Sequence, residues 1–156
     1  MGKQHTYRST IEWTGNKGQG TKTYSGYERS HVWRTNGKPD LLLSSDPAFR
    51  GDVSRQNPEE LLLAALSSCH LLSYLHVCTV AGVIVTGYTD LAEGIMEETP
   101  DGGGHFTEVT LHIEVTVAEA SMIEKANELH EKAHHLCFIA NSVNFLVKHT
   151  STATGG

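Results

Sequence analysis

Two cysteine residues hold positions in which a thiol could do chemistry. Cys69 lies within a long, largely apolar segment, and Cys137 follows a second segment at a helix end that we expect to be mobile and exposed. A thiolate is a nucleophile and a metal ligand, and two thiols that meet can form a disulfide. Each cysteine taken alone is also explained as a core residue, because free cysteine is among the most buried residue types.

The third cysteine, Cys78, is expected to be a core residue on a different side of the helix from Cys69. Three cysteines cannot all pair within one chain, and no two form a Cys-x-x-Cys motif. The N-terminus is polar and has no apolar export segment. We therefore expect a reducing, cytoplasmic location, in which a cysteine is a core residue, a reactive thiol or a ligand.

A His-Glu-x-x-His pattern at His130, Glu131 and His134 offers a second constellation. On a helix this spacing places two imidazoles on one face, where a zinc hydrolase binds its metal and uses the glutamate as a base. Such a site also needs a third ligand, and no acidic residue follows Cys137 that could supply it. His149 is the only candidate there. Amphipathic spacing explains the same residues as the solvated side of a core helix, so both interpretations stay open.

The segment that carries Cys69 has the signals of a helix over residues 57–82. Asn57 is a capping residue, Pro58 suits the first helical position, and acidic residues follow in the first turn. Gly82 is expected to end the helix. Because the helix is apolar nearly all round, we expect it to be central and buried, with a second copy of the chain sharing the helical core.

Short β-prone runs predict four strands before this helix, over residues 5–13, 20–27, 31–33 and 41–43. Turn residues at 14–19 and the pair Asn36-Gly37 predict hairpins, and a polar connection at 46–56 carries Arg50 and Arg55. After the helix we expect, in order, a strand at 83–97, a turn at 100–104, a half-buried strand at 105–117, a helix at 118–136 and a strand at 143–149. This order predicts an α+β fold with antiparallel sheet covering the helices.

Length and composition favour one domain over residues 1–156. Its expected parts are hairpins and connection (1–56), central helix (57–82), strands and second helix (83–149) and a frayed tail (150–156). With 38% hydrophobic and 19% charged residues the chain is not a disordered one. A net charge of −6 disfavours a nucleic-acid partner, and no uninterrupted apolar run is long enough to predict a membrane partner.

The run from Asn57 to Cys69, Asn-Pro-Glu-Glu-Leu-Leu-Leu-Ala-Ala-Leu-Ser-Ser-Cys, resembles the signature motif of the OsmC/Ohr family of thiol proteins that reduce hydroperoxides. Phe49-Arg50-Gly51 stands shortly before it, where OsmC-type members carry an arginine, and Cys137 matches the position of the second cysteine. The sequence departs from better-known members at His70 and Phe138, which follow the two cysteines.

The resemblance implies antiparallel sheets wrapped around two main helices in an intertwined homodimer. It implies a peroxidase without metal or cofactor, in which Cys69 attacks an organic hydroperoxide and the resulting sulfenic acid forms a disulfide with Cys137. It also implies a dithiol as the reductant, such as one carried on a lipoylated protein. Arg50 would stabilise the thiolate and Glu59 would hold the guanidinium, with Arg55 as the competing cation.

Helix geometry adds a constraint to this scheme. Glu59 and Cys69 are about 15 Å apart on one straight helix, which one arginine cannot easily bridge. Antiparallel pairing of two such helices would bring Glu59 of one copy towards Cys69 of the other, so we expect composite active sites in a homodimer. The alternative is a non-enzymatic module that binds a hydrophobic ligand at the dimer interface, with Cys69 inert.

Overall fold

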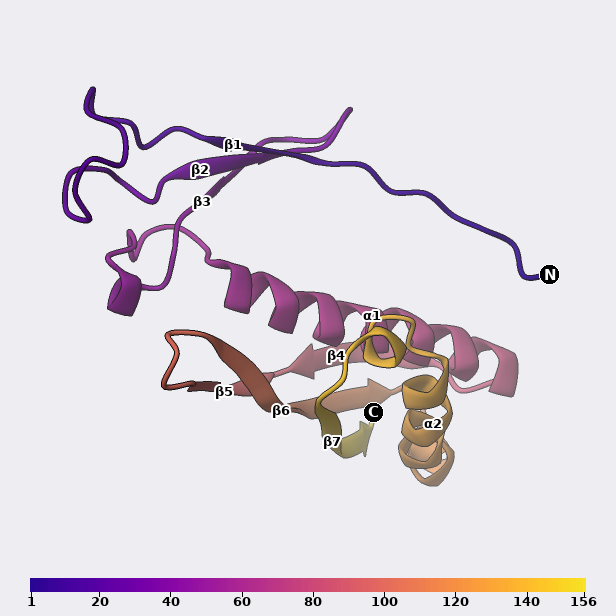
Figure 1. Ribbon diagram of the computed structural model, residues 1–156. Helices are drawn as coiled ribbons and strands as arrows, with labels where there is room; N and C mark the ends of the chain where they lie inside the picture. Colours follow the sequence, from indigo (N-terminus) through magenta and orange to yellow (C-terminus); the bar gives the residue numbers. More distant parts are fainter. The chain divides into compact units, whose positions relative to one another are not determined.

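The computed structural model describes all 156 residues, which form two compact units, Met1–Leu61 and Leu62–Gly156. The first unit contains an antiparallel sheet of three short strands, β1 (Thr10–Trp13), β2 (His31–Arg34) and β3 (Leu41–Leu43), in that order (Figure 1). The hairpin predicted at Asn36-Gly37 is confirmed between β2 and β3, and Gly37 adopts the left-handed φ of 76° that such a turn requires. A short 3₁₀ helix, η1 (Pro47–Phe49), follows.

The strand expected over residues 20–27 is wrong, because these residues form turns around an arginine. The Arg29 guanidinium donates hydrogen bonds of 2.7 Å to the carbonyl oxygens of Tyr24 and Tyr27. It also lies over both tyrosine rings, at 4.4 and 4.1 Å from their centroids. The partner of β1 is consequently β2 rather than the segment that follows the first turn.

The central helix, α1 (Pro58–Ala81), has the predicted bounds and caps. The Glu60 N–H donates to the Asn57 side chain at 2.9 Å, and the Asn57 N–H donates to the Glu60 carboxylate at 3.1 Å, which completes a capping box. At the other end Gly82, with a φ of 75°, and Val83 donate back to the last turn.

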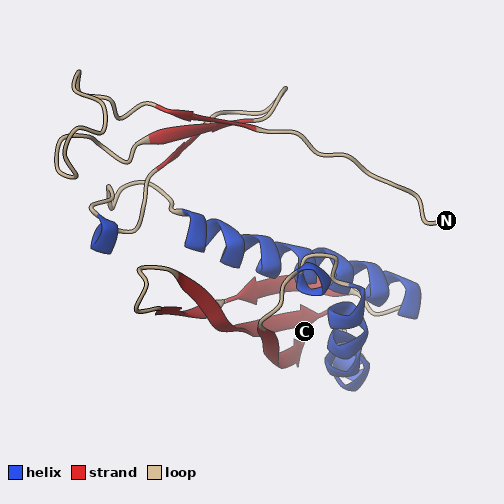
Figure 2. Ribbon diagram, viewed as in Figure 1, coloured by secondary structure: helices blue, strands red, loops and turns tan.

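The second unit is built on β6 (Gly104–Val117), the longest strand. Two strands pair antiparallel with successive parts of one edge of β6: β4 (Val85–Asp90) and β5 (Glu93–Glu98). The strand expected over 83–97 is therefore two strands, interrupted at Leu91 and Ala92. Alternate β6 residues from Val109 to Val117 are buried as predicted and pack against α1 and α2 (Ile123–Leu136), which Figure 2 shows in blue.

The C-terminal tail is ordered, contrary to the expected fraying of residues 150–156. It belongs to β7 (Leu146–Gly155), which pairs with the second edge of β6 in parallel, from Leu146 opposite Glu108 to Gly155 opposite Val117. The α+β class is confirmed, but the sheet is mixed rather than antiparallel. The connecting 3₁₀ turns are η2 (Ala120–Met122), which delays the start of α2 relative to the predicted residue 118, and η3 (Ala140–Ser142).

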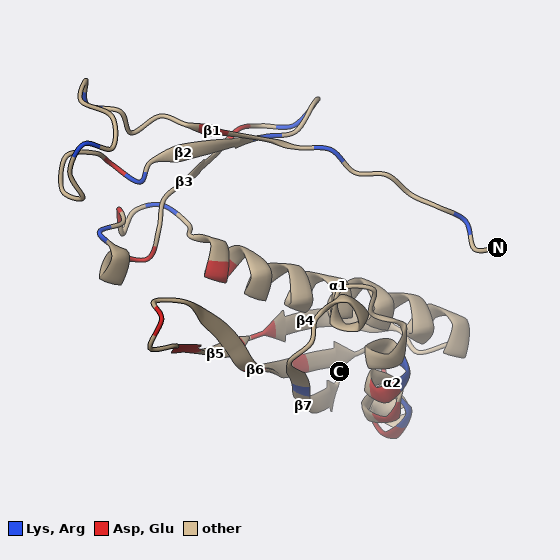
Figure 3. Ribbon diagram, in the orientation of Figure 1, with Lys and Arg blue, Asp and Glu red and all other residues tan.

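In the single chain α1 is buried on one face only, which corrects the expectation of a fully buried helix. Leu72 and Val80 are 65% and 70% exposed. Beyond its first turn α1 carries no charged residue (Figure 3). By length and composition it could cross a membrane, a test that the core helix of a water-soluble protein also passes.

Candidate active site

One stripe of α1 lines an apolar pocket. Cys69, Leu72, Ser73 and His76 recur at helical spacing and so share a face. Leu136 and Phe138, from the end of α2 and the residues after it, line the other side. The pocket has a volume of about 440 Å³, and Cys69 is half-buried within it. Sequence reasoning did not identify these neighbours of Cys69, although the i, i+3, i+4, i+7 spacing contained the signal for those on α1.

The structure places Cys137 beside Cys69. The Cys69 thiol is close enough to influence the pKa of Cys137. Cys137 caps the end of α2 and is only 1% exposed, so the expectation of an exposed thiol is wrong. Burial raises the pKa of Cys137 to about 11, and the neighbouring Cys69 thiol raises it further. The Ala140 N–H, which donates to the Cys137 sulfur at 3.4 Å, lowers the pKa but does not offset the effect of burial.

The pair therefore combines an accessible thiol with a buried, protonated one. Because a disulfide holds its two Cα atoms only about 4.4–6.8 Å apart, it forms only between neighbouring thiols such as these two. Cys78 is a core residue, as predicted: it is 1% exposed, and burial raises the pKa of its thiol. The chemistry available to this site is thiol–disulfide chemistry between Cys69 and Cys137.

Arg50 is held in the first unit by an unusual backbone conformation. It is the one non-glycine residue with a positive φ, 65°, which costs about 1–3 kcal/mol and persists where the surroundings impose it. Its N–H donates to the Pro47 carbonyl at 3.0 Å. A side chain at Gly51 would collide with the Ser45 carbonyl oxygen, so glycine is required there. The Arg50 guanidinium lies 5.9 Å from the centroid of the Tyr24 ring.

Arginine is confined to the unit that lacks Cys69 and Cys137. All five arginines of the chain lie within Met1–Leu61, and none lies within Leu62–Gly156. Arg55 forms an ion pair with Asp52 at 3.4 Å, and Arg34 forms ion pairs with Glu12 and Asp40. Arg50 forms no such pair, so between the two arginines that the sequence left open, its guanidinium is the one available for an anion.

Glu59 occupies the first turn of α1, and one oxygen of its carboxylate, Oε2, is buried without a hydrogen-bond partner. A buried, unpartnered carboxylate oxygen is costly. The side chain therefore has unused capacity to accept a hydrogen bond from a cation, which is the role that the resemblance gave it.

The zinc-hydrolase arrangement is not formed. His130 is buried, with Nδ1 3.1 Å from Nε2 of His70, and the Glu131 carboxylate lies 3.1 Å from Nε2 of His149. No group of three side chains with metal-binding atoms is arranged to hold an ion. The predicted pattern is explained as helix packing, with His130 facing the core and Glu131 facing solvent.

The buried histidines make the free energy of unfolding depend on pH. Burial, and to a lesser extent the neighbouring histidines, lower the pKa of His70 to about 3 and that of His130 to about 4. Because an unfolded histidine titrates near 6.5, the unfolded chain binds more protons below that pH. The free energy of unfolding should therefore be intact above pH 6.5 and fall by up to about 1.4 kcal/mol per pH unit for each histidine below it.

Urea unfolding between pH 7.5 and 5 measures this loss. A His70→Gln variant should lose one histidine's share of the slope, whereas His105→Gln, at an exposed position, should not. An equal slope in the two variants would contradict the assignment.

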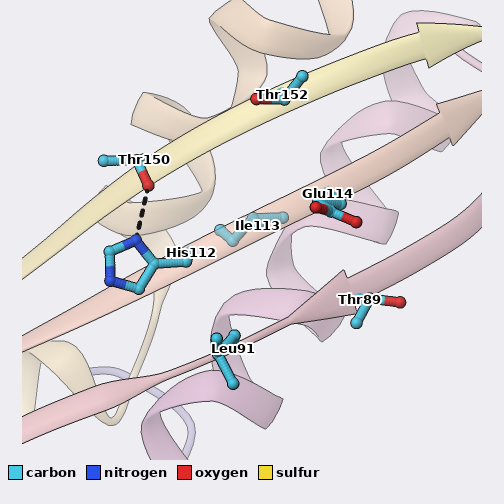
Figure 4. Close-up of a pocket in the computed structure, with 7 residues that line it drawn as sticks. All are labelled: Thr89, Leu91, His112, Ile113, Glu114, Thr150 and Thr152. Atoms are coloured by element: carbon cyan, nitrogen blue, oxygen red, sulfur yellow. Dashed lines mark hydrogen bonds between the residues drawn. The ribbon is translucent and has the colours of Figure 1, made fainter.

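A second pocket lies on the solvent face of the sheet, between β4, β6 and β7 (Figure 4). It is lined by threonines, Glu114 and His112 and has no thiol. Both ring nitrogens of His112 are engaged, with Thr150 at 3.1 Å and Glu93 at 3.2 Å. This pocket therefore offers no nucleophile, and the Cys69 pocket is the better candidate.

A half-buried thiol beside a buried one on this α+β fold makes Cys69 and Cys137 a candidate dithiol site. The family model described as OsmC-like protein matches residues 51–152. The chain therefore belongs to the OsmC-like family, which confirms the resemblance read from the sequence. No curated protein sequence matches the chain.

Solved structures agree with this membership. An OsmC-like protein of unknown function from Vibrio cholerae is 30% identical, with a TM-score of 0.84 over 95% of this chain and 99% of that one. Organic hydroperoxide resistance proteins from Legionella pneumophila and Elizabethkingia anophelis share the fold at 21% and 19% identity, with TM-scores of 0.70 and 0.68. The alignments cover 98% and 100% of this chain, and 99% and 100% of those chains.

Proposed function

We propose that the protein reduces organic hydroperoxides, with Cys69 as the attacking thiol and Cys137 as the resolving thiol. The contact between an accessible and a buried thiol carries the proposal. In the first step the Cys69 thiolate attacks the O–O bond, which breaks. The sulfur is oxidised to a sulfenic acid, and the other oxygen leaves with a proton as an alcohol.

In the second step the Cys137 thiol attacks the sulfenic sulfur, a disulfide forms, and water leaves. The raised pKa of Cys137, about 11, supports this order, because a thiol that stays protonated near neutral pH does not compete as the first nucleophile. A small dithiol, of the kind carried by a lipoyl group, would then return two electrons and two protons.

The pocket lining supports an organic rather than an inorganic peroxide. Leu72, Leu136 and Phe138 surround Cys69 with apolar surface, which stabilises an alkyl or aryl substituent by about 25 cal/mol per Å² buried. Hydrogen peroxide has no such substituent to bury.

The proposal includes a homodimer with composite sites. The exposed apolar face of α1 and Phe138, which is 79% exposed, supports a second copy as its cover. The cation that stabilises the thiolate must come from Met1–Leu61 if it is an arginine. In this proposal Arg50 supplies it to Cys69 of the partner and Glu59 holds the guanidinium.

Anaerobic titration with cumene hydroperoxide followed by peptide mapping tests the function. One equivalent should produce a Cys69–Cys137 disulfide and leave Cys78 reduced, and Cys137→Ser should stop at a Cys69 sulfenic acid that dimedone traps. Oxidation of Cys69 no faster than that of free glutathione would contradict the peroxidase and favour the hydrophobic-ligand module.

A further inference from the structure

The two helices that carry the thiols are joined inside the second unit by a pair of histidines. His70 directly follows Cys69 on α1, and His130 lies two turns before Cys137 on α2. Nε2 of His70 is 3.1 Å from Nδ1 of His130, and each residue is only 1% exposed. The rings are nearly parallel, at 4°, so one ring donates an N–H to the lone pair of the other.

A second polar contact lies one turn away. The Tyr74 hydroxyl donates to the Ala126 carbonyl at 2.9 Å, and the Tyr74 ring stacks on His130 with centroids 3.9 Å apart. His70 and Tyr74 are one turn apart on α1, as are Ala126 and His130 on α2. Two buried hydrogen bonds therefore span the helices side by side, and both are satisfied in only one helix register.

The surroundings keep this pair uncharged. The side chains around it are Tyr74 of α1, His134 of α2 and His149 of β7. The ring centroid of His149 lies 5.5 Å from that of His70 and 5.9 Å from that of His130. The nearby carboxylate, Glu131, contacts His149 instead. No carboxylate favours protonation of either ring, so the neutral hydrogen bond persists near neutral pH.

We propose that the His70–His130 hydrogen bond positions Cys69 against Cys137, and so sets how readily their disulfide forms. Only the biological use of this positioning rests on the proposed function; the effect on disulfide formation does not. A buried bond that fixes the register of α1 and α2 also fixes the approach of the two sulfurs, because each sulfur is carried on or at the end of one of these helices. His70 and His130 are positioning residues and do not touch the substrate.

Matched amide variants test the proposal. Glutamine places a nitrogen where histidine has Nε2, and asparagine places one where histidine has Nδ1. His70→Gln and His130→Asn should therefore keep the bond, whereas His70→Asn and His130→Gln should lose it. The readout is the equilibrium of the Cys69–Cys137 pair with reduced and oxidised glutathione, in which one glutathione disulfide yields one protein disulfide and two thiols.

The bond-breaking variants should lower the effective concentration of the thiol pair about tenfold, the worth of one buried hydrogen bond. The bond-keeping variants should stay within about threefold of the wild type. Equal values within each matched pair, high or low, would overturn the proposal, and if His70→Asn does not fold, the His130 pair decides. No hydroperoxide enters this measurement, so its failure is distinguishable from failure of the peroxidase activity.

Discussion

Replacing Cys69 by serine should abolish hydroperoxide reduction, with a loss of at least about 10³-fold in rate. Serine is nearly isosteric, so the half-buried site should still fold. The neighbouring thiol, Cys137, cannot take over, because its pKa of about 11 leaves almost no thiolate at neutral pH. Consumption of cumene hydroperoxide with a dithiol reductant measures the effect.

Cys78→Ser is the matched control for this experiment, since it removes a thiol from the same helix. Cys78 is buried in the core and lies outside the Cys69 pocket, so activity should stay within about twofold although stability falls. A Cys69→Ser variant that kept more than about a tenth of the wild-type rate would exclude Cys69 as the nucleophile.

Local signals predicted α1 and the family accurately. The capping box at Asn57 and Glu60 and the stop at Gly82 lie within a few residues of the helix ends that they define. The same short run carries the Asn-Pro-Glu-to-Cys spacing. Helix boundaries and this motif are properties of adjacent residues, and no tertiary context was needed to read them.

Pairing between distant residues was not predictable in the same way. The partner of β1 depends on the turns that wrap around Arg29. The C-terminal tail is ordered because the ten residues of β7 pair with an edge of β6. The burial of Cys137 likewise follows from contact with α1, although a helix end is usually exposed. Each error concerns a contact between segments that the sequence alone does not bring together.

The residues of the candidate site also fall into those indicated by local sequence and those that needed the structure. The resemblance implied roles for Glu59 and Cys69 within the motif and for Cys137 after the second helix, without any geometry. Our proposal of Arg50 rather than Arg55 rests on the ion pair between Arg55 and Asp52, which no sequence signal indicated. Tyr24, beside Arg50, had no sequence signal as a neighbour of that arginine.

Arg50→Ala should lower the rate of peroxide reduction about 10²-fold, because a cation that stabilises the thiolate and the departing oxygen contributes about 3 kcal/mol to such a transition state. Arg55→Ala is the control: its guanidinium already pairs with Asp52, so it should change the rate by less than about threefold. The second-order rate constant with cumene hydroperoxide measures both. Comparable losses in the two variants would remove Arg50 from its proposed role.

Glu59→Gln should follow Arg50→Ala in direction with a smaller loss, since the amide still accepts a hydrogen bond but lacks the charge that holds a guanidinium. Its thermal stability should stay close to that of the wild type, because Oε2 has no partner within the chain. Equal losses of activity and stability would make Glu59 a structural residue.

Subunit complementation separates a composite site from one built within a single chain. Equal amounts of the nearly inactive Arg50→Ala chain and the inactive Cys69→Ser chain are unfolded together and refolded, so that half of the dimers are mixed. If Arg50 serves the partner's Cys69, each mixed dimer contains one fully native site and one doubly altered site. Activity should then return to about a quarter of the wild-type value. If both residues act within one chain, every site in the mixture lacks either the guanidinium or the thiol, and activity should stay at the level of the separate variants.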